Sequence, residues 1–208
     1  MSLMNTSKFI NLVYSYLGYK HIIRNDEIDL KINDCLKEIE KLQQFKYIYT
    51  EFDYKLDFLN NNEAYKKLLD KTESYYLCLT TLGKRIDDRC QYYSKFDLEK
   101  MVIFDATSNA YLEYMADEFE EANLKKPRTY RFCPGYQGTD IKDIKEIFKY
   151  INHKKIGVEI LDSNLMVPLK TMCGIIGIGK TNKKECGACN FKGNCKYIKE
   201  KRKCYSTT

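Results

Sequence analysis

The segment from Tyr130 to Tyr136 carries side chains that suit a small anionic or zwitterionic ligand. Arg131 has a planar fork of donors that matches a carboxylate. Pro134 and Gly135 favour a turn, and the missing Cβ of Gly135 lets a ligand approach the main chain. Tyr136 adds a hydroxyl and a ring face where the turn ends. Pro-Gly-Tyr by itself is typical of an ordinary turn, but the whole group predicts a corner for a charged molecule with a flat base.

The helices and strands on either side of this corner must hold its side chains in place. The residues from Asp97 to Leu124 show the longest helical periodicity in the chain, with a broad apolar face. Glu113 lies in the middle of this helix, where a carboxylate is rarely buried without a partner; the plain alternative is a solvated glutamate. After the corner come an amphipathic helix over Asp140–Tyr150, a strand over Gly157–Asp162, the element Met166–Thr171 and the apolar run Met172–Gly179.

This order of parts resembles the activation domain of vitamin B12-dependent methionine synthase. That family carries an Arg-x-x-x-Gly-Tyr element with Pro before the Gly, then a helix, a strand, a Met-x-Pro element and a Gly-rich strand. Here the first element is Arg131–Tyr136, and the second is Met166-Val167-Pro168-Leu169-Lys170-Thr171. The resemblance is close over residues 130–179 and looser before them. Thr171 stands where the family usually has Ser, which we interpret as a mild change.

The resemblance implies an α+β fold, in which helices pack against a curved antiparallel sheet. It also implies an activation protein that binds S-adenosylmethionine and supports the reductive remethylation of cob(II)alamin. The synthase domains are absent from this chain, so cobalamin would come on a separate methionine synthase chain. An electron donor such as flavodoxin or ferredoxin would be the other partner.

The family pattern also implies individual roles for the corner residues. Arg131 would bind the methionyl carboxylate, and Glu113 would meet a polar or cationic part of the ligand. Gly135 and its neighbours would offer backbone contacts. Tyr136 would stand near the methyl group or the corrin, as the one candidate catalytic side chain. The implied ligand-binding residues are therefore Glu113, Arg131, Cys133, Pro134, Gly135 and Tyr136.

A second chemistry is indicated by the cysteines at the end of the chain. Cys186, Cys189, Cys195 and Cys204 have the spacing C-x2-C-x5-C-x8-C. In a reducing compartment such a set favours Zn or an iron–sulfur cluster over disulfides. We therefore divide the chain into a globular domain over residues 1–181 and a basic, Cys-rich tail over residues 182–208. The tail leaves two alternatives open: unliganded thiols, or an iron–sulfur electron-transfer or metal-binding protein that acts through this cluster.

Composition narrows the function classes further. The chain has 208 residues and a net charge of +6, but residues 180–208 alone hold nine basic and two acidic side chains. The rest is close to neutral, which argues against a broad nucleic-acid surface. No apolar run is long enough to cross a membrane, and no signal peptide is recognisable, so we expect a cytoplasmic protein.

The run from Gly174 to Thr181 satisfies the phosphate-loop pattern G-x-x-x-x-G-K-[ST]. Its apolar, β-branched interior and the absence of a following amphipathic helix favour a core strand instead, so we do not predict nucleotide hydrolysis. Helices over residues 7–17 and 25–42 are expected only to cover the core. Residues 45–58 are expected to form one or two strands.

Overall fold

The computed structural model describes residues 7–19 and 23–180. Its helices are α1 (Ser7–Tyr16), α2 (Asp26–Leu42), α3 (Glu63–Leu68), α4 (Lys84–Phe96), α5 (Leu98–Asn123) and α6 (Asp143–Tyr150), with short 3-10 helices η2 (Asp57–Asn61) and η3 (His153–Ile156). Its strands are β1 (Lys46–Phe52), β2 (Ser74–Thr81), β3 (Glu159–Ile160), β4 (Met166–Val167) and β5 (Thr171–Ile178).

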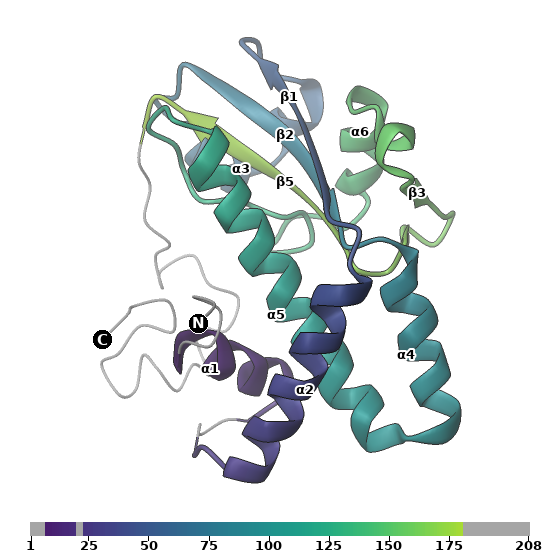
Figure 1. Cartoon of the computed structure of the whole chain (residues 1–208). Coiled ribbons are helices and arrows are strands. Elements are labelled where there is room, and N and C mark those ends of the chain that lie inside the picture. Colours follow the sequence, from purple (N-terminus) through teal and green to yellow (C-terminus); the bar gives the residue numbers. More distant parts are fainter. Residues whose placement is uncertain (1–6, 20–22, 181–208) are drawn as a thin grey trace.

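The central sheet is antiparallel and has the order β1-β2-β5, while β3 and β4 form a separate small hairpin (Figure 1). The segment 127–132 runs along the free edge of β5. There Phe132 and Ile175 exchange two main-chain hydrogen bonds of 2.9 Å each. This pairing satisfies the backbone groups of the edge and holds the start of the corner against the sheet.

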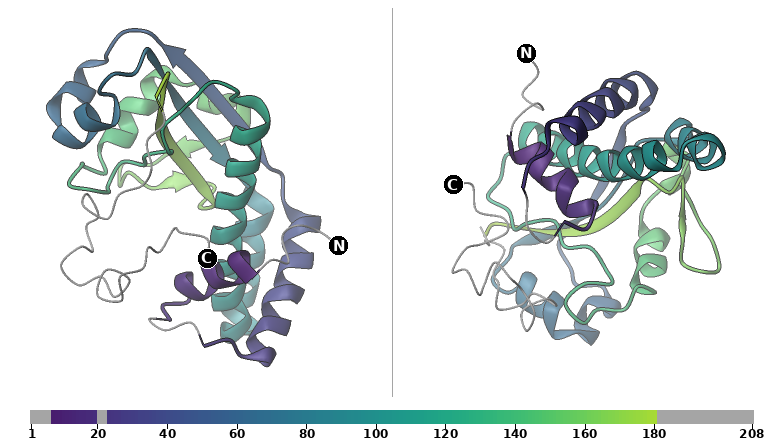
Figure 2. Two further views of the ribbon diagram at one scale, coloured as in Figure 1. Left: turned by 90° about the vertical axis from the view of Figure 1, so that its left-hand side faces the viewer. Right: turned by 90° about the horizontal axis from the view of Figure 1, so that it is seen from below.

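Both faces of the sheet are buried, which explains why β2 and β5 are apolar runs and not alternating ones. On one face, Leu77, Leu79 and Ile175 pack with residues of α3 and α6. On the other face, Ile176 and Ile178 pack with the side chains around the end of α5. Figure 2 shows the helices on the two sides of the sheet.

A second apolar core lies among the helices, where α1, α2 and α4 pack against α5. Two side chains start these helices by capping their free amides. Asn25 Oδ1 accepts hydrogen bonds from the amides of Glu27 and Ile28, and Asp97 caps α5 through the amide of Lys100. The 26 residues of α5 are long enough to extend from this core to the sheet. The helix therefore links the two halves of the molecule.

The predicted fold class is confirmed, and so are the helices over 7–17, 25–42 and 97–124 to within two residues. Residues 45–58 form a single strand and then turn into η2. The helix expected from Asp140 begins at Asp143, because residues 140–142 form a turn in which the Asp140 side chain accepts from the Lys142 amide. The strand expected over 157–162 shrinks to two residues, since only the short β4 pairs with it.

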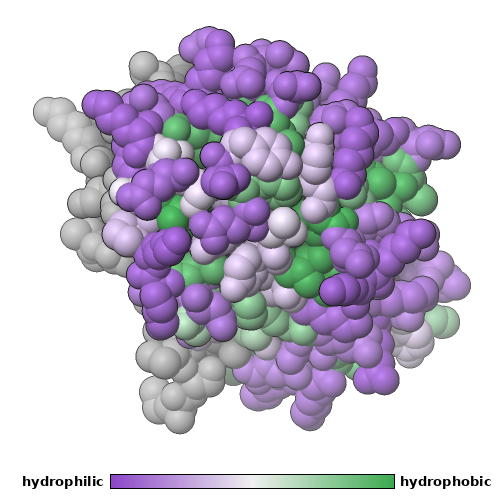
Figure 3. Space-filling view, turned by 90° about the horizontal axis from the view of Figure 1, so that it is seen from above, coloured by the Kyte–Doolittle hydropathy of each residue, from purple (hydrophilic) through white to green (hydrophobic). Residues whose placement is uncertain are grey.

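The run 171–178 is the strand β5, paired with β2 along its whole length, as expected for a core strand and unlike a phosphate loop. Within the described part of the chain, no helix is both long and apolar enough to cross a bilayer. On the face seen from above, hydrophilic side chains surround smaller groups of apolar ones (Figure 3).

Candidate functional site

The corner after Phe132 is a tight turn that projects Tyr136. The amide of Gly135 donates to Thr139 Oγ1 at 3.0 Å, and the amide and hydroxyl of Thr139 both donate to the Tyr136 carbonyl. Gly135 has φ +89°, and a Cβ there would lie 2.9 Å from Ile141 Cδ1. The positive φ is the reason that glycine is favoured here, because the flexible, exposed end of Ile141 can move aside for a Cβ. Tyr136 itself is 61% exposed.

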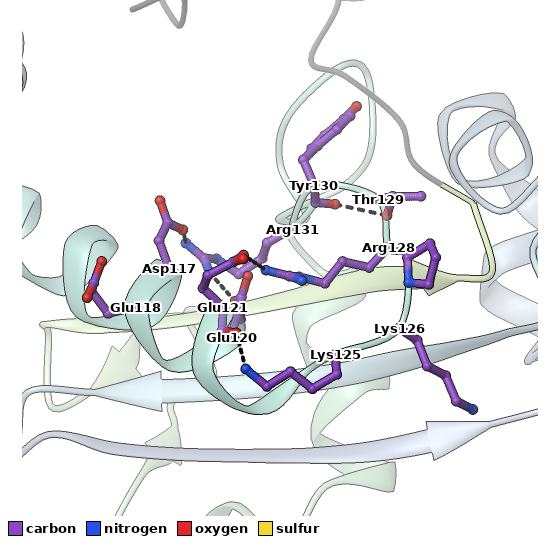
Figure 4. A pocket seen from close by; sticks show the side chains of 11 residues that line it. Asp117, Glu118, Glu120, Glu121, Lys125, Lys126, Arg128, Thr129, Tyr130 and Arg131 are labelled. Carbon is purple, nitrogen blue, oxygen red and sulfur yellow. Dashed lines mark hydrogen bonds and ion pairs between the residues drawn. The ribbon is translucent and has the colours of Figure 1, made fainter.

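Arg131 enters from the segment beside β5 and lies across that strand. A Cβ at Gly174 would come within 2.5 Å of Arg131 Cγ, so this glycine makes room for the arginine stem. The Arg131 side chain is only 8% exposed. Its Nη1 donates to the Glu120 carboxylate, and its Nη2 donates to Asp117 Oδ1 at 2.9 Å (Figure 4). Both terminal nitrogens of the predicted carboxylate binder thus already hold carboxylates of α5.

The two partners of Arg131 differ in their surroundings. Glu120 is buried and also accepts a hydrogen bond of 2.8 Å from the Tyr47 hydroxyl of β1. Asp117 is 70% exposed and, within the described residues, has Arg131 as its ionic partner. Burial alone would lower the pKa of the Arg131 guanidinium, but Glu120 and Asp117 outweigh it and raise that pKa. Glu120 therefore belongs to a satisfied buried network, whereas Asp117 is a partner that solvent or a ligand can replace.

Glu113 lies one helical turn before Asp117 on the same helix, and it is half-buried. Its carboxylate accepts a hydrogen bond from the Tyr16 hydroxyl of α1. Burial raises the pKa of the Tyr136 phenol, and the neighbouring Cys133 and Glu113 raise it further. The structure thus brings together three of the predicted residues, Glu113, Cys133 and Tyr136. It adds Tyr16, which sequence reasoning treated only as part of a core-covering helix.

An open hollow of about 730 Å³ lies beside Arg131. It is lined by Asp117, Glu118, Glu120, Glu121, Lys125, Lys126, Pro127, Arg128, Thr129, Tyr130 and Arg131. The charges of its four acidic and four basic side chains cancel. Arg128 Nη2 pairs with Glu121 Oε2 at 2.7 Å. Glu113 and Tyr136 are not among its lining residues.

A second, apolar hollow of about 490 Å³ lies beside the corner, next to Gly135. Its lining residues are Ile141, Ile144, Ser163, Asn164, Leu165, Met166 and Leu169. Ile141, Leu165 and Leu169 are exposed, so the corner borders an apolar surface on this side.

The predicted metal ligands Cys186, Cys189, Cys195 and Cys204 lie outside the described residues. Among the residues that the structure describes, no group of three or more His, Cys, Asp or Glu side chains is arranged to hold a metal ion. The metal prediction therefore stays a prediction.

No protein-family model matches this chain, and no curated protein matches it. Among solved structures, the chain is similar to the MetH reactivation domain in a crystal structure bound to AdoHcy, with a TM-score of 0.57 and 14% sequence identity. The match covers 77% of this chain and 67% of that chain. It confirms, at the level of the fold, the resemblance based on residues 130–179.

Proposed function

We propose that this protein binds S-adenosylmethionine and acts as the activation component of a separate, cobalamin-dependent methionine synthase. The observation that carries the proposal is that Glu113, Cys133 and Tyr136 lie near one another, with Cys133 also near Arg131, in a fold shared with a domain that is itself bound to AdoHcy in its crystal structure. These four residues, from the middle of α5 and from the corner, supply an anionic group, a cationic group and an aromatic ring.

The side chains suit the charges of a methionyl group. Arg131 binds the ligand carboxylate at the position that exposed Asp117 now occupies. One carboxylate replaces another, so the buried guanidinium keeps two anionic partners throughout, and no buried charge is left unpaired. Glu113 offers the complementary negative charge for the ligand ammonium one helical turn away.

The corner holds the other end of the ligand. Gly135 is exposed at the turn, and the exposed ring of Tyr136 stands beside the sulfonium, where its electron-rich face favours a cation. The protein's role is then to orient the S-methyl group outward, which is a proximity effect. The partner's cobalamin would supply the reduced cobalt that accepts this methyl group, with the electron coming from flavodoxin or ferredoxin.

Calorimetric titration of the full chain with S-adenosylmethionine tests the binding step. We expect saturable binding at one site. Arg131→Lys keeps the positive charge but loses the planar fork, so its affinity should fall about tenfold or more. The matched control is Arg128→Lys, which lies in the same hollow but pairs with Glu121 and should bind normally. Absence of saturable heat with the folded wild-type protein would contradict the proposal.

The activation role needs its own test. A cobalamin-loaded methionine synthase without an activation domain should lose turnover as its cobalt is oxidised. Adding this protein together with S-adenosylmethionine and a reduced flavodoxin should restore turnover. Two outcomes would contradict the activation role and leave only ligand binding. Turnover could return without the protein, or it could fail to return although the protein binds S-adenosylmethionine.

The alternative function, an iron–sulfur or Zn protein acting through the four tail cysteines, depends on sequence spacing alone. A chain ended after Thr181 separates the two functions, because the corner lies wholly before that residue. Retained S-adenosylmethionine binding together with lost metal content would assign the two properties to different parts of the chain.

A further inference from the structure

The helix α1 is held rigidly against the middle of α5. Val13 and Tyr14 are fully buried, and the ring of Phe9 meets that of Tyr114 edge-on, with centroids 6.4 Å apart. The Tyr14 hydroxyl donates to Asp29 Oδ1 at 3.0 Å and so ties α1 to the start of α2. The position of α1 next to the candidate site is therefore fixed by packing on two other helices.

Tyr16 lies at the edge of the buried face of α1, with 42% of its surface exposed. Its hydroxyl donates to Glu113 Oε1, across 97 positions of sequence. Burial raises the pKa of this phenol, and Glu113, Tyr136 and Cys133 raise it further, so the hydroxyl remains a donor at neutral pH. The hydrogen bond to Glu113 places Tyr16 next to the corner residues.

The three carboxylates of α5 around the site have different partners. Asp117 and Glu120 both pair with the Arg131 guanidinium. Glu113 forms no ion pair with a lysine or arginine of the described residues; its partner there is the neutral hydroxyl of Tyr16. A neutral donor orients a carboxylate without neutralising its charge. The Glu113 end of the site thus remains able to accept a cation, while the Arg131 end accepts an anion.

We propose that Tyr16 is a positioning residue of the S-adenosylmethionine site: it holds one oxygen of Glu113 so that the other faces the ligand's ammonium group. This inference rests on the proposed function and extends it, since it makes α1 part of the binding site. It also identifies the recognised feature as an amino-acid zwitterion, because Glu113 and the Asp117 partner of Arg131 lie on adjacent turns of α5.

The test is a double-mutant cycle on the full chain, measured by calorimetric titration with S-adenosylmethionine. Tyr16→Phe keeps the ring and its packing but removes the donor. A hydrogen bond to a charged group is worth enough that we expect about a tenfold loss of affinity. Glu113→Gln should lose at least as much, and adding Tyr16→Phe to it should cause no further loss. Tyr92→Phe, a similarly exposed tyrosine on α4, is the control and should bind normally.

Each outcome separates this inference from the function on which it rests. If the wild-type protein does not bind S-adenosylmethionine, both the proposed function and this inference are overturned. If the wild type binds and Tyr16→Phe binds equally well, only the role of Tyr16 is overturned. If the losses from Tyr16→Phe and Glu113→Gln are independent, or follow a lowered melting temperature, Tyr16 is merely structural and the inference is again overturned.

Discussion

Two regions of α5 use acidic side chains in opposite ways. Toward the end of the helix, Glu120 is buried between Arg131 and the Tyr47 hydroxyl. In its middle, Glu113 is half-buried and is held by Tyr16 at the open corner. A buried charge must have protein partners, so Glu120 serves the fold. A partly exposed charge with a neutral partner costs the fold little and stays available to a ligand.

The largest effect should come from breaking the buried network. Glu120→Ala leaves the Arg131 guanidinium, which is 8% exposed, without its buried partner. We expect the free energy of unfolding to fall by about 3 kcal/mol or more. Chemical denaturation measures this change. Glu113→Ala is the comparison on the same helix and should be much milder; equal losses for the two variants would erase the distinction.

Gly174→Ala disturbs the same region by adding a methyl group, without changing any charge. The added Cβ would lie 2.5 Å from Arg131 Cγ, so the arginine stem or β5 must shift. We expect a destabilisation of about 1–3 kcal/mol, together with weaker S-adenosylmethionine binding because Arg131 is displaced. Thermal unfolding and calorimetric titration of one preparation measure both effects. A fully stable variant with normal affinity would show that the stem is free to move.

The network of Glu120, Arg131 and the Tyr47 hydroxyl should also make the protein less stable at alkaline pH. Burial raises the pKa of the Tyr47 phenol, with Cys78 and Glu120 raising it further. Above about pH 10 the unfolded chain loses this proton while the folded chain keeps it, so stability falls by roughly 1 kcal/mol for each further pH unit. Stability measured between pH 8 and 11 should fall less steeply for Tyr47→Phe than for the wild type. Parallel curves would mean that this hydroxyl titrates normally.

The smallest effect on stability is expected at the exposed end of the network. Asp117→Asn removes a surface partner of Arg131, and surface ion pairs add little to stability. The variant should unfold like the wild type but bind S-adenosylmethionine a few-fold more tightly, because no aspartate then competes with the ligand carboxylate. Glu118→Gln, in the same hollow, is the control and should change neither property. Weaker binding by Asp117→Asn would show that Asp117 assists the ligand.

Much of the fold was predictable from local patterns. The predicted helices over 97–124 and 25–42 each depend on residues close together in the sequence, and both were confirmed to within two residues. The ends of short elements were less predictable, because β3 has only the length that its partner β4 allows. The order of the corner, the helix and the Gly-rich strand was enough to identify the fold.

The sequence by itself determined which groups are present at the candidate site: the glycine turn, the arginine, the tyrosine and a glutamate on the long helix. Only the tertiary structure decided their partners. Arg131 pairs with residues 11 and 14 positions away, and Glu113 pairs with a tyrosine 97 positions away. The reason is physical: chemical type and backbone preference are local properties, whereas the burial that distinguishes Glu120 from Glu113 arises only when distant segments pack together.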